Sequence, residues 1–219
     1  MTRPESVVDA SSPSGGTALS AGVCFSGGKD STLAALLLDP FYEVTLVTCH
    51  FGVTDAVDNA RRTAEALGFP FEAVELDRSV AETAVERMDA DGFPRNGIQY
   101  VHEHSLEAVA ERYPTVADGT RRDDRVPTVS RATAQSLEDR HGVDYLSPLA
   151  GFGRNAVDRL VEATLNVEVG PSEQLAKGDY EAELRTLLGE RAGESRVEEV
   201  FPDHDQTRVV GLRNPDDRP

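Results

Sequence analysis

The chain has 219 residues, of which 39% are hydrophobic and 28% charged, and its formal net charge is −17. This length and balance fit one globular domain with a real core and exclude a disordered chain. No apolar run approaches the roughly 18 residues needed to cross a bilayer, so we expect no membrane partner and a cytoplasmic location. Two cysteines, Cys24 and Cys49, are too few for a disulfide framework or a four-thiolate metal site.

Strand-like and helix-like segments alternate along the chain after residues 1–16, which we expect to be a flexible N-terminal lead. The alternation predicts an α/β fold, with a doubly wound, mostly parallel five-stranded sheet and helices on both faces. Residues 17–202 are expected to form one domain, and residues 203–219 a polar C-terminal tail. The expected strands are 17–25, 43–50, 71–76, 115–117 and 144–147, and the expected helices are 30–38, 54–67, 79–90, 97–112, 130–140, 154–165 and 179–189.

The hexapeptide Ser26-Gly27-Gly28-Lys29-Asp30-Ser31 follows the first expected strand and opens the first expected helix. Its two glycines allow the backbone to approach a phosphate, and the helix adds the positive end of its dipole. Ser26 and Ser31 offer hydroxyl donors, while Asp30 either holds Mg²⁺ at the phosphates or caps the helix. Because ligands of such sheets bind beyond the carboxyl ends of the strands, this loop is the strongest candidate for a phosphate site.

A second polar segment, Gly119-Thr120-Arg121-Arg122-Asp123-Asp124, follows the expected strand 115–117. Its adjacent carboxylates, Asp123 and Asp124, can bind Mg²⁺ while waters and substrate phosphates complete the coordination shell. Arg121 offers a cationic fork suited to phosphate or pyrophosphate. The alternative is a solvated loop whose charges cancel.

Both segments resemble motifs of one superfamily. SGGKDS is similar to the SGGxDS signature of the PP-loop ATP pyrophosphatases, which are adenine-nucleotide α-hydrolase-like proteins and include GMP synthetase, NAD synthetase and tRNA thiolation enzymes. GTRRDD resembles the G-[HT]-x-x-D-D element of the tRNA-modifying members. Over roughly residues 20–212 the chain looks like an archaeal PP-loop family labelled as a subunit of tRNA thiouridylate-type enzymes. The resemblance implies ATP bound with Mg²⁺, adenylation of an acceptor with release of pyrophosphate, and displacement of AMP by an amine or sulfur nucleophile.

The resemblance also assigns roles to individual residues. The family usually meets the adenine at the end of the second strand, where Phe51 either stacks on the base or is a core residue. Several members use a lysine far downstream of the loop, and Lys177 is the candidate here. Asp30, Asp123 and Lys177 are the expected catalytic residues, and Asp30, Asp123 and Asp124 the expected metal ligands. The residues expected to contact ATP are Ser26, Gly27, Gly28, Lys29, Asp30, Ser31, Phe51, Gly119, Thr120 and Arg121.

The nucleophile and the partners stay open at this stage. Cys49 ends the second expected strand and is the one candidate sulfur carrier, but the chain lacks the cysteine pair or triad of thiolation enzymes. An amine as the second substrate, or sulfur supplied by a partner, is therefore as good an interpretation as direct thiolation by this chain. No glutaminase or RNA-binding appendage is recognisable, so we expect a protein partner that supplies the nucleophile or presents RNA. A tRNA is a candidate acceptor, and a homodimer is a further option. The alternative function is a non-catalytic regulatory subunit that binds ATP or AMP.

Two histidines lie in the expected helix 97–112. His102 and His104 are two residues apart, so they do not share a helical face and make a poor joint metal site. One of them, or Asn96, is a candidate to face the cleft as an acid, a base or an acceptor-binding group.

The strong acidity is typical of a haloarchaeal protein. Lys29 and Lys177 are the only lysines among 22 basic residues, and the acidic residues are spread along the whole chain. In about 1 M salt the Debye length is about 3 Å, so repulsion of an RNA would be largely screened. A surface depleted of lysine retains it where a compact ammonium is needed, as at a phosphate, or by chance.

Overall fold

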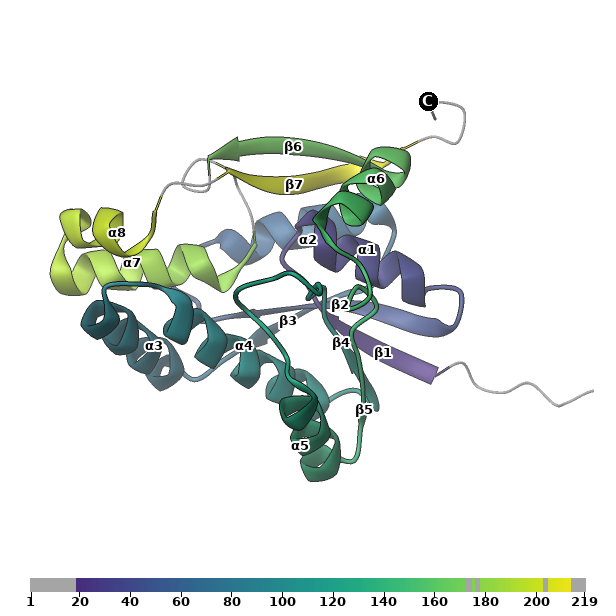
Figure 1. The fold of residues 1–219 in the computed structure, drawn as a ribbon, viewed down its shortest axis with the longest axis horizontal. Helices are drawn as coiled ribbons and strands as arrows, with labels where there is room; N and C mark the ends of the chain where they lie inside the picture. Colours follow the sequence, from purple (N-terminus) through teal and green to yellow (C-terminus); the bar gives the residue numbers. More distant parts are fainter. Residues whose placement is uncertain (1–18, 172–174, 176–177, 203–204, 214–219) are drawn as a thin grey trace, which may run out of the picture.

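Five parallel strands form the central sheet, in the order β3-β2-β1-β4-β5 (Figure 1). The structure is a computed structural model that describes residues 19–171, 175, 178–202 and 205–213. The strand order reverses between β1 and β4, so the sheet is doubly wound and the predicted fold class is confirmed. The strands are β1 (Leu19–Cys24), β2 (Tyr42–His50), β3 (Phe71–Glu75), β4 (Thr115–Ala117) and β5 (Asp144–Leu146).

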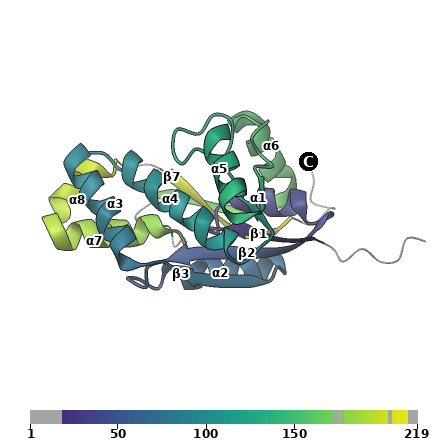
Figure 2. The same ribbon diagram turned by 90° about the horizontal axis from the view of Figure 1, so that it is seen from below.

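Helices cover both faces of this sheet (Figures 1 and 2). Because side chains of a strand alternate between faces, β2 contributes to two cores. Its Val44 and Leu46 belong to one core, whereas Val47 and Cys49 belong to the other. The first core is completed by α1 (Lys29–Leu38), α2 (Ala56–Leu67) and α6 (Arg154–Thr164), and the second by α3 (Arg78–Asp91), α4 (Arg95–Ala110), α5 (Arg131–His141), α7 (Tyr180–Ala192) and α8 (Glu194–Val200).

A separate two-stranded antiparallel sheet joins β6 (Leu165–Pro171) to β7 (Asp205–Leu212). The expected polar tail over residues 203–219 is therefore wrong for residues 205–212. In Figure 1 the ribbon lies over α1 and α2, and Val209 of β7 is 1% exposed there. A ribbon that buries one side needs few apolar residues, and β7 buries only Val209 and begins with four polar residues, which gives its sequence the look of a tail.

Some expectations fall outside the described residues. These are the N-terminal lead 1–16, Lys177, and the remainder of the tail at 203–204 and 214–219. Within the described ranges, none of the helices combines the length and the apolar character that a membrane crossing requires.

Candidate functional site

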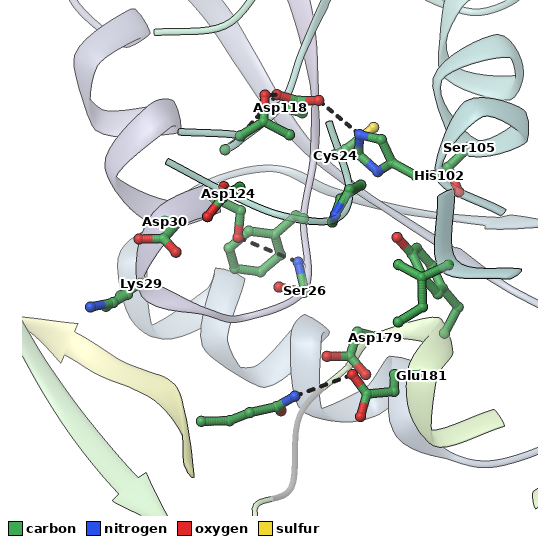
Figure 3. A pocket seen from close by; sticks show the side chains of 18 of the residues that line it. Cys24, Ser26, Lys29, Asp30, His102, Ser105, Asp118, Asp124, Asp179 and Glu181 are labelled. Atoms are coloured by element: carbon green, nitrogen blue, oxygen red, sulfur yellow. Dashed lines mark hydrogen bonds and ion pairs between the residues drawn. The ribbon is translucent and has the colours of Figure 1, made fainter. Parts of the chain in front are cut away.

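A cavity of about 460 Å³ lies at the carboxyl edge of the central sheet (Figure 3). Residues that end or follow β1, β2 and β4 line it, and they include Ser26, Cys49 and Asp118. Side chains from α4 and from the starts of α7 and β7 complete the wall. The cavity thus occupies the point between β1 and β4 where the strand order reverses, the usual ligand position in such sheets.

The loop 26–31 is held in shape by its own hydroxyl groups. The backbone N–H of Gly28 donates to the Ser26 hydroxyl at 3.3 Å, and the Ser31 hydroxyl donates to the Gly28 carbonyl at 3.2 Å. Gly27 has φ of 77°, in the left-handed region that favours glycine. The first N–H groups of α1 have no carbonyl partner within the helix, and this loop sets them beside the cavity. Lys29, Asp30 and Ser31 all line it.

Three other segments pack directly against this loop. A Cβ on Gly119 would lie 2.6 Å from the backbone nitrogen of Ser31, so the loop after β4 meets the first turn of α1 in backbone contact. The Gly178 N–H donates to the Ser26 carbonyl at 3.1 Å, and the Val209 N–H of β7 donates to the Gly27 carbonyl at 2.9 Å. The segment after the predicted lysine therefore reaches the loop, although Lys177 itself is outside the described residues.

Arg121 lies among the three predicted metal ligands. Its backbone N–H and its Nε donate to Asp124 at 2.7 and 3.0 Å. The same Nε is 3.8 Å from the carboxylate of Asp30 and 3.9 Å from that of Asp123. Burial disfavours the charge on Arg121, but the Asp124 bond and the neighbouring carboxylates raise its pKa above the ordinary value. Asp123 also accepts from the N–H of Arg154 at the start of α6, and this bond lowers the pKa of Asp123.

The carboxylates therefore fit Mg²⁺ only in part. In the part of the chain that the structure describes, no three metal-binding side chains come together as a metal site. Mg²⁺ needs only one or two carboxylates when phosphates and waters supply the other ligands. Asp30, in the first turn of α1, lines the cavity and could supply one such carboxylate, but Asp30 and Asp124 both lie within ion-pair distance of Arg121.

Lys29 pairs with a carboxylate of a neighbouring helix. Its ammonium donates to Asp158 of α6, and in Figure 3 its side chain extends away from Ser26 and His102. A phosphate in the cavity would have to compete with Asp158 for this lysine.

Phe51 is a core residue, as the alternative interpretation held. It is 5% exposed, belongs to the core of α3, α4 and α7, and is not a lining residue of the cavity. The structure therefore does not place Phe51 where it could stack on a base.

Glu183 of α7 holds the loop after β2 and was not singled out in the sequence. It is 1% exposed, and its carboxylate accepts from the N–H groups of Phe51 and Val53, each at 2.8 Å. A signal was available, because Glu183 stands one helical turn before Leu187 on the apolar side of the expected helix. A carboxylate at a core position needs buried donors, and the loop supplies them.

A buried pair joins α4 to the end of β4. His102 Nε2 lies 2.8 Å from Asp118 Oδ2, and the two residues are 6% and 1% exposed. Burial acts to raise the pKa of Asp118, but hydrogen bonds from His102 and Thr120 outweigh it and lower that pKa. Of the three candidates on this helix, only His102 lines the cavity. His104 instead packs edge-on against Tyr100, and Asn96 donates to Asp91.

Both cysteines line the cavity as free thiols. Burial raises the pKa of Cys24 well above its usual value, and it raises the pKa of Cys49 to about 12. Because the thiolate is the reactive form, neither residue is an activated sulfur nucleophile in this state.

The fold and the site define a class: α/β proteins with a glycine-rich strand–helix loop facing a cavity at the switch point of a parallel sheet. The chain belongs to DUF7411, a family of unknown function whose model matches residues 19–211. It is 45% identical over 192 residues to an uncharacterised protein of Methanocaldococcus jannaschii, a match that covers 87% of this chain and 95% of that relative.

Solved structures from two archaea are similar. A crystal structure from Methanocaldococcus jannaschii, described as a predicted subunit of tRNA methyltransferase, is 43% identical with a TM-score of 0.83 and covers 90% of this chain and 99% of that one. A U34-tRNA thiolase from Methanococcus maripaludis is 17% identical with a TM-score of 0.39, over 67% of this chain and 57% of that one. The second likeness is too weak to carry an argument.

Proposed function

We propose that the protein binds ATP at the loop 26–31 and splits it to AMP and pyrophosphate while adenylating an acceptor. The observation that carries this proposal is the backbone contact between Gly119 and the first turn of α1, at the edge of a 460 Å³ cavity. Two chain segments thus bring a helix N-terminus and an arginine-bearing loop to one point, which suits a polyphosphate. The resemblance of both segments to PP-loop motifs supports the same assignment.

In this proposal the chain acts chiefly by positioning and electrostatics. The N–H groups of the loop and of α1 would bind the phosphates, and Arg121 would face the pyrophosphate leaving group. Lys29 and Lys177 are the candidates for a second cation at that group. Mg²⁺, held by Asp30 with Asp123 or Asp124, would neutralise phosphate charge.

The acceptor proposed is a tRNA, with a protein partner. The similarity to a protein described as a predicted subunit of tRNA methyltransferase supports both parts. One observation favours a second candidate, a non-catalytic subunit that senses ATP or AMP, because Arg121 already engages the carboxylates that catalysis would require.

The test follows the products of ATP. The protein is incubated with ATP, MgCl2, high KCl and total archaeal tRNA, and the nucleotides are identified by mass spectrometry. We expect AMP and pyrophosphate, stimulated by tRNA and lost in Asp30→Ala, with Asp39→Ala at the other end of α1 as the matched control. ATP binding without turnover favours the sensing subunit, and ADP as the product contradicts the proposed cleavage.

A further inference from the structure

The proposed adenylation does not use the buried pair of His102 and Asp118, although both side chains line the same cavity. Removing a histidine and a carboxylate from water costs free energy, and apolar residues would fill the same space without that cost. A buried ionisable pair that opens on a ligand cavity, rather than into the core, is a typical functional feature.

Asp118 is fixed by several donors. Besides His102, it accepts from the N–H and the hydroxyl of Thr120 at 2.9 and 2.7 Å. The Thr120 hydroxyl is in turn 3.1 Å from the hydroxyl of Ser147, which donates to the Thr120 carbonyl at 3.0 Å. These donors keep Asp118 ionised, so it is an acceptor only. The contact with His102 must then be a bond from Nε2–H.

This bond determines the tautomer of the neutral imidazole. With the proton on Nε2, the lone pair is on Nδ1, which Figure 3 shows on the side of the ring away from Asp118. A histidine oriented in this way by a carboxylate can take a proton and keep the resulting positive charge beside a negative one. The pair therefore has the arrangement of a general base held by a positioning residue.

We propose that His102, oriented by Asp118, is the general base for an amine that displaces AMP from the adenylated acceptor. The inference rests on the proposed function and names the class of its second substrate. The amine nitrogen forms a C–N bond to the activated carbon, and the C–O bond to AMP breaks, so AMP leaves with the electron pair. The surplus N–H proton passes to Nδ1 of His102, and Asp118 stabilises the imidazolium.

The surroundings of the pair favour an amine over sulfur. An attacking amine must lose a proton, whereas a persulfide or sulfide anion need not. Cys24 and Cys49, the thiols of this cavity, are held protonated by burial and would be poor sulfur carriers. Cys24 of β1 and Tyr145 of β5 lie close enough to Asp118 to be affected by its charge, and Cys49 of β2 and Tyr180 of α7 line the same cavity. At other positions of α4, Arg87 of α3 stacks on Tyr100 and Arg140 of α5 pairs with Glu107.

The experiment measures two partial reactions on the full chain, with total archaeal tRNA as acceptor and ammonium chloride as amine. Exchange between ATP and labelled pyrophosphate reports adenylation, and ammonium-dependent AMP release reports displacement. For His102→Gln we expect the ratio of AMP release to exchange to fall by about 10²- to 10⁴-fold. His104→Gln, half-buried on the same helix but not lining the cavity, should keep the wild-type ratio.

Asp118→Asn is the second variant, and it supplies the test in the case where His102→Gln does not fold. An orienting role for Asp118 shifts the pH profile of AMP release, whereas a merely structural role lowers the unfolding midpoint and leaves the profile in place. Exchange with an unchanged ratio in His102→Gln, or release driven by sulfide but not ammonium, would overturn the role of His102 alone. No exchange in the wild-type protein overturns the proposed function, and the role of His102 with it.

Discussion

Arg121 and Asp124 are joined by two hydrogen bonds, because the Asp124 carboxylate accepts from both the backbone N–H and the guanidinium of Arg121. Asp30 stands 3.8 Å from the same guanidinium. A side-chain cation thus lies among carboxylates that were expected to surround a metal ion. Nucleotide binding with Mg²⁺ would require these charges to be rearranged, and the first prediction addresses that exchange.

Arg121→Gln should lower the free energy of unfolding by about 1–3 kcal/mol, because Asp124 loses a charged partner at a half-buried position. Millimolar MgCl2 should restore part of this loss, since a divalent ion can take the place of the guanidinium between the carboxylates. Urea unfolding in EDTA and in MgCl2 measures both effects. Arg122→Gln, which loses a long bond to the Gly151 carbonyl and a weak attraction to Asp123, is the control. An Mg²⁺ response no larger than that of the wild type would contradict the prediction.

Glu183→Gln should loosen the loop after β2. The amide has one acceptor oxygen and turns an NH2 group toward buried N–H donors, so bonds to Phe51 and Val53 cannot both be kept. We expect a loss of about 1–3 kcal/mol in the free energy of unfolding and faster hydrogen exchange at these two amides. Glu198→Gln, on the exposed side of α8, should change neither measurement. Unchanged amide protection in Glu183→Gln would refute this account of the loop.

Gly119→Ala should disrupt the contact between the loop after β4 and α1. The added Cβ would lie 2.6 Å from the Ser31 nitrogen and 2.7 Å from the Asp30 carbonyl carbon, and backbone atoms cannot move aside as a flexible side chain can. We expect a destabilisation of about 1–3 kcal/mol, together with weaker ATP binding by calorimetry. Gly151→Ala, where an added Cβ meets nothing within 4 Å, is the matched control. Equal stability of the two variants would show that the contact is loose.

Cys24 and Cys49 should resist alkylation in the folded protein. Their pKa values are raised, that of Cys49 to about 12, so the reactive thiolate is scarce at pH 8 and becomes common only as the pH rises toward those values. Iodoacetamide should modify both at pH 8 slower by on the order of 10²-fold or more than in the guanidinium-unfolded chain. Peptide mass spectrometry gives the two rates. Rapid modification of Cys49 in the folded state would restore it as a candidate sulfur carrier.

The sequence by itself determined the features that depend on short stretches of chain. Alternation of apolar runs predicted the five strands and the parallel sheet, and the glycines and the helix start of 26–31 marked the loop that ends β1. The site loop after β4 was found in the same way. These signals are local, because the hydrophobic periodicity of a strand or helix and the residue types of a turn each depend on a few consecutive residues.

Only the tertiary structure decided which distant residues meet. Three contacts join segments that are far apart in the sequence, and no periodic pattern predicts that such segments meet. They are the β6–β7 ribbon, the bond of Glu183 to the loop after β2, and the buried contact of His102 with Asp118. Arg121 illustrates the same point within one loop. The sequence suggested that its guanidinium binds phosphate, but in the fold the guanidinium donates to Asp124. Charged side chains choose partners by distance and desolvation, and those are set when the sheet and its helices pack.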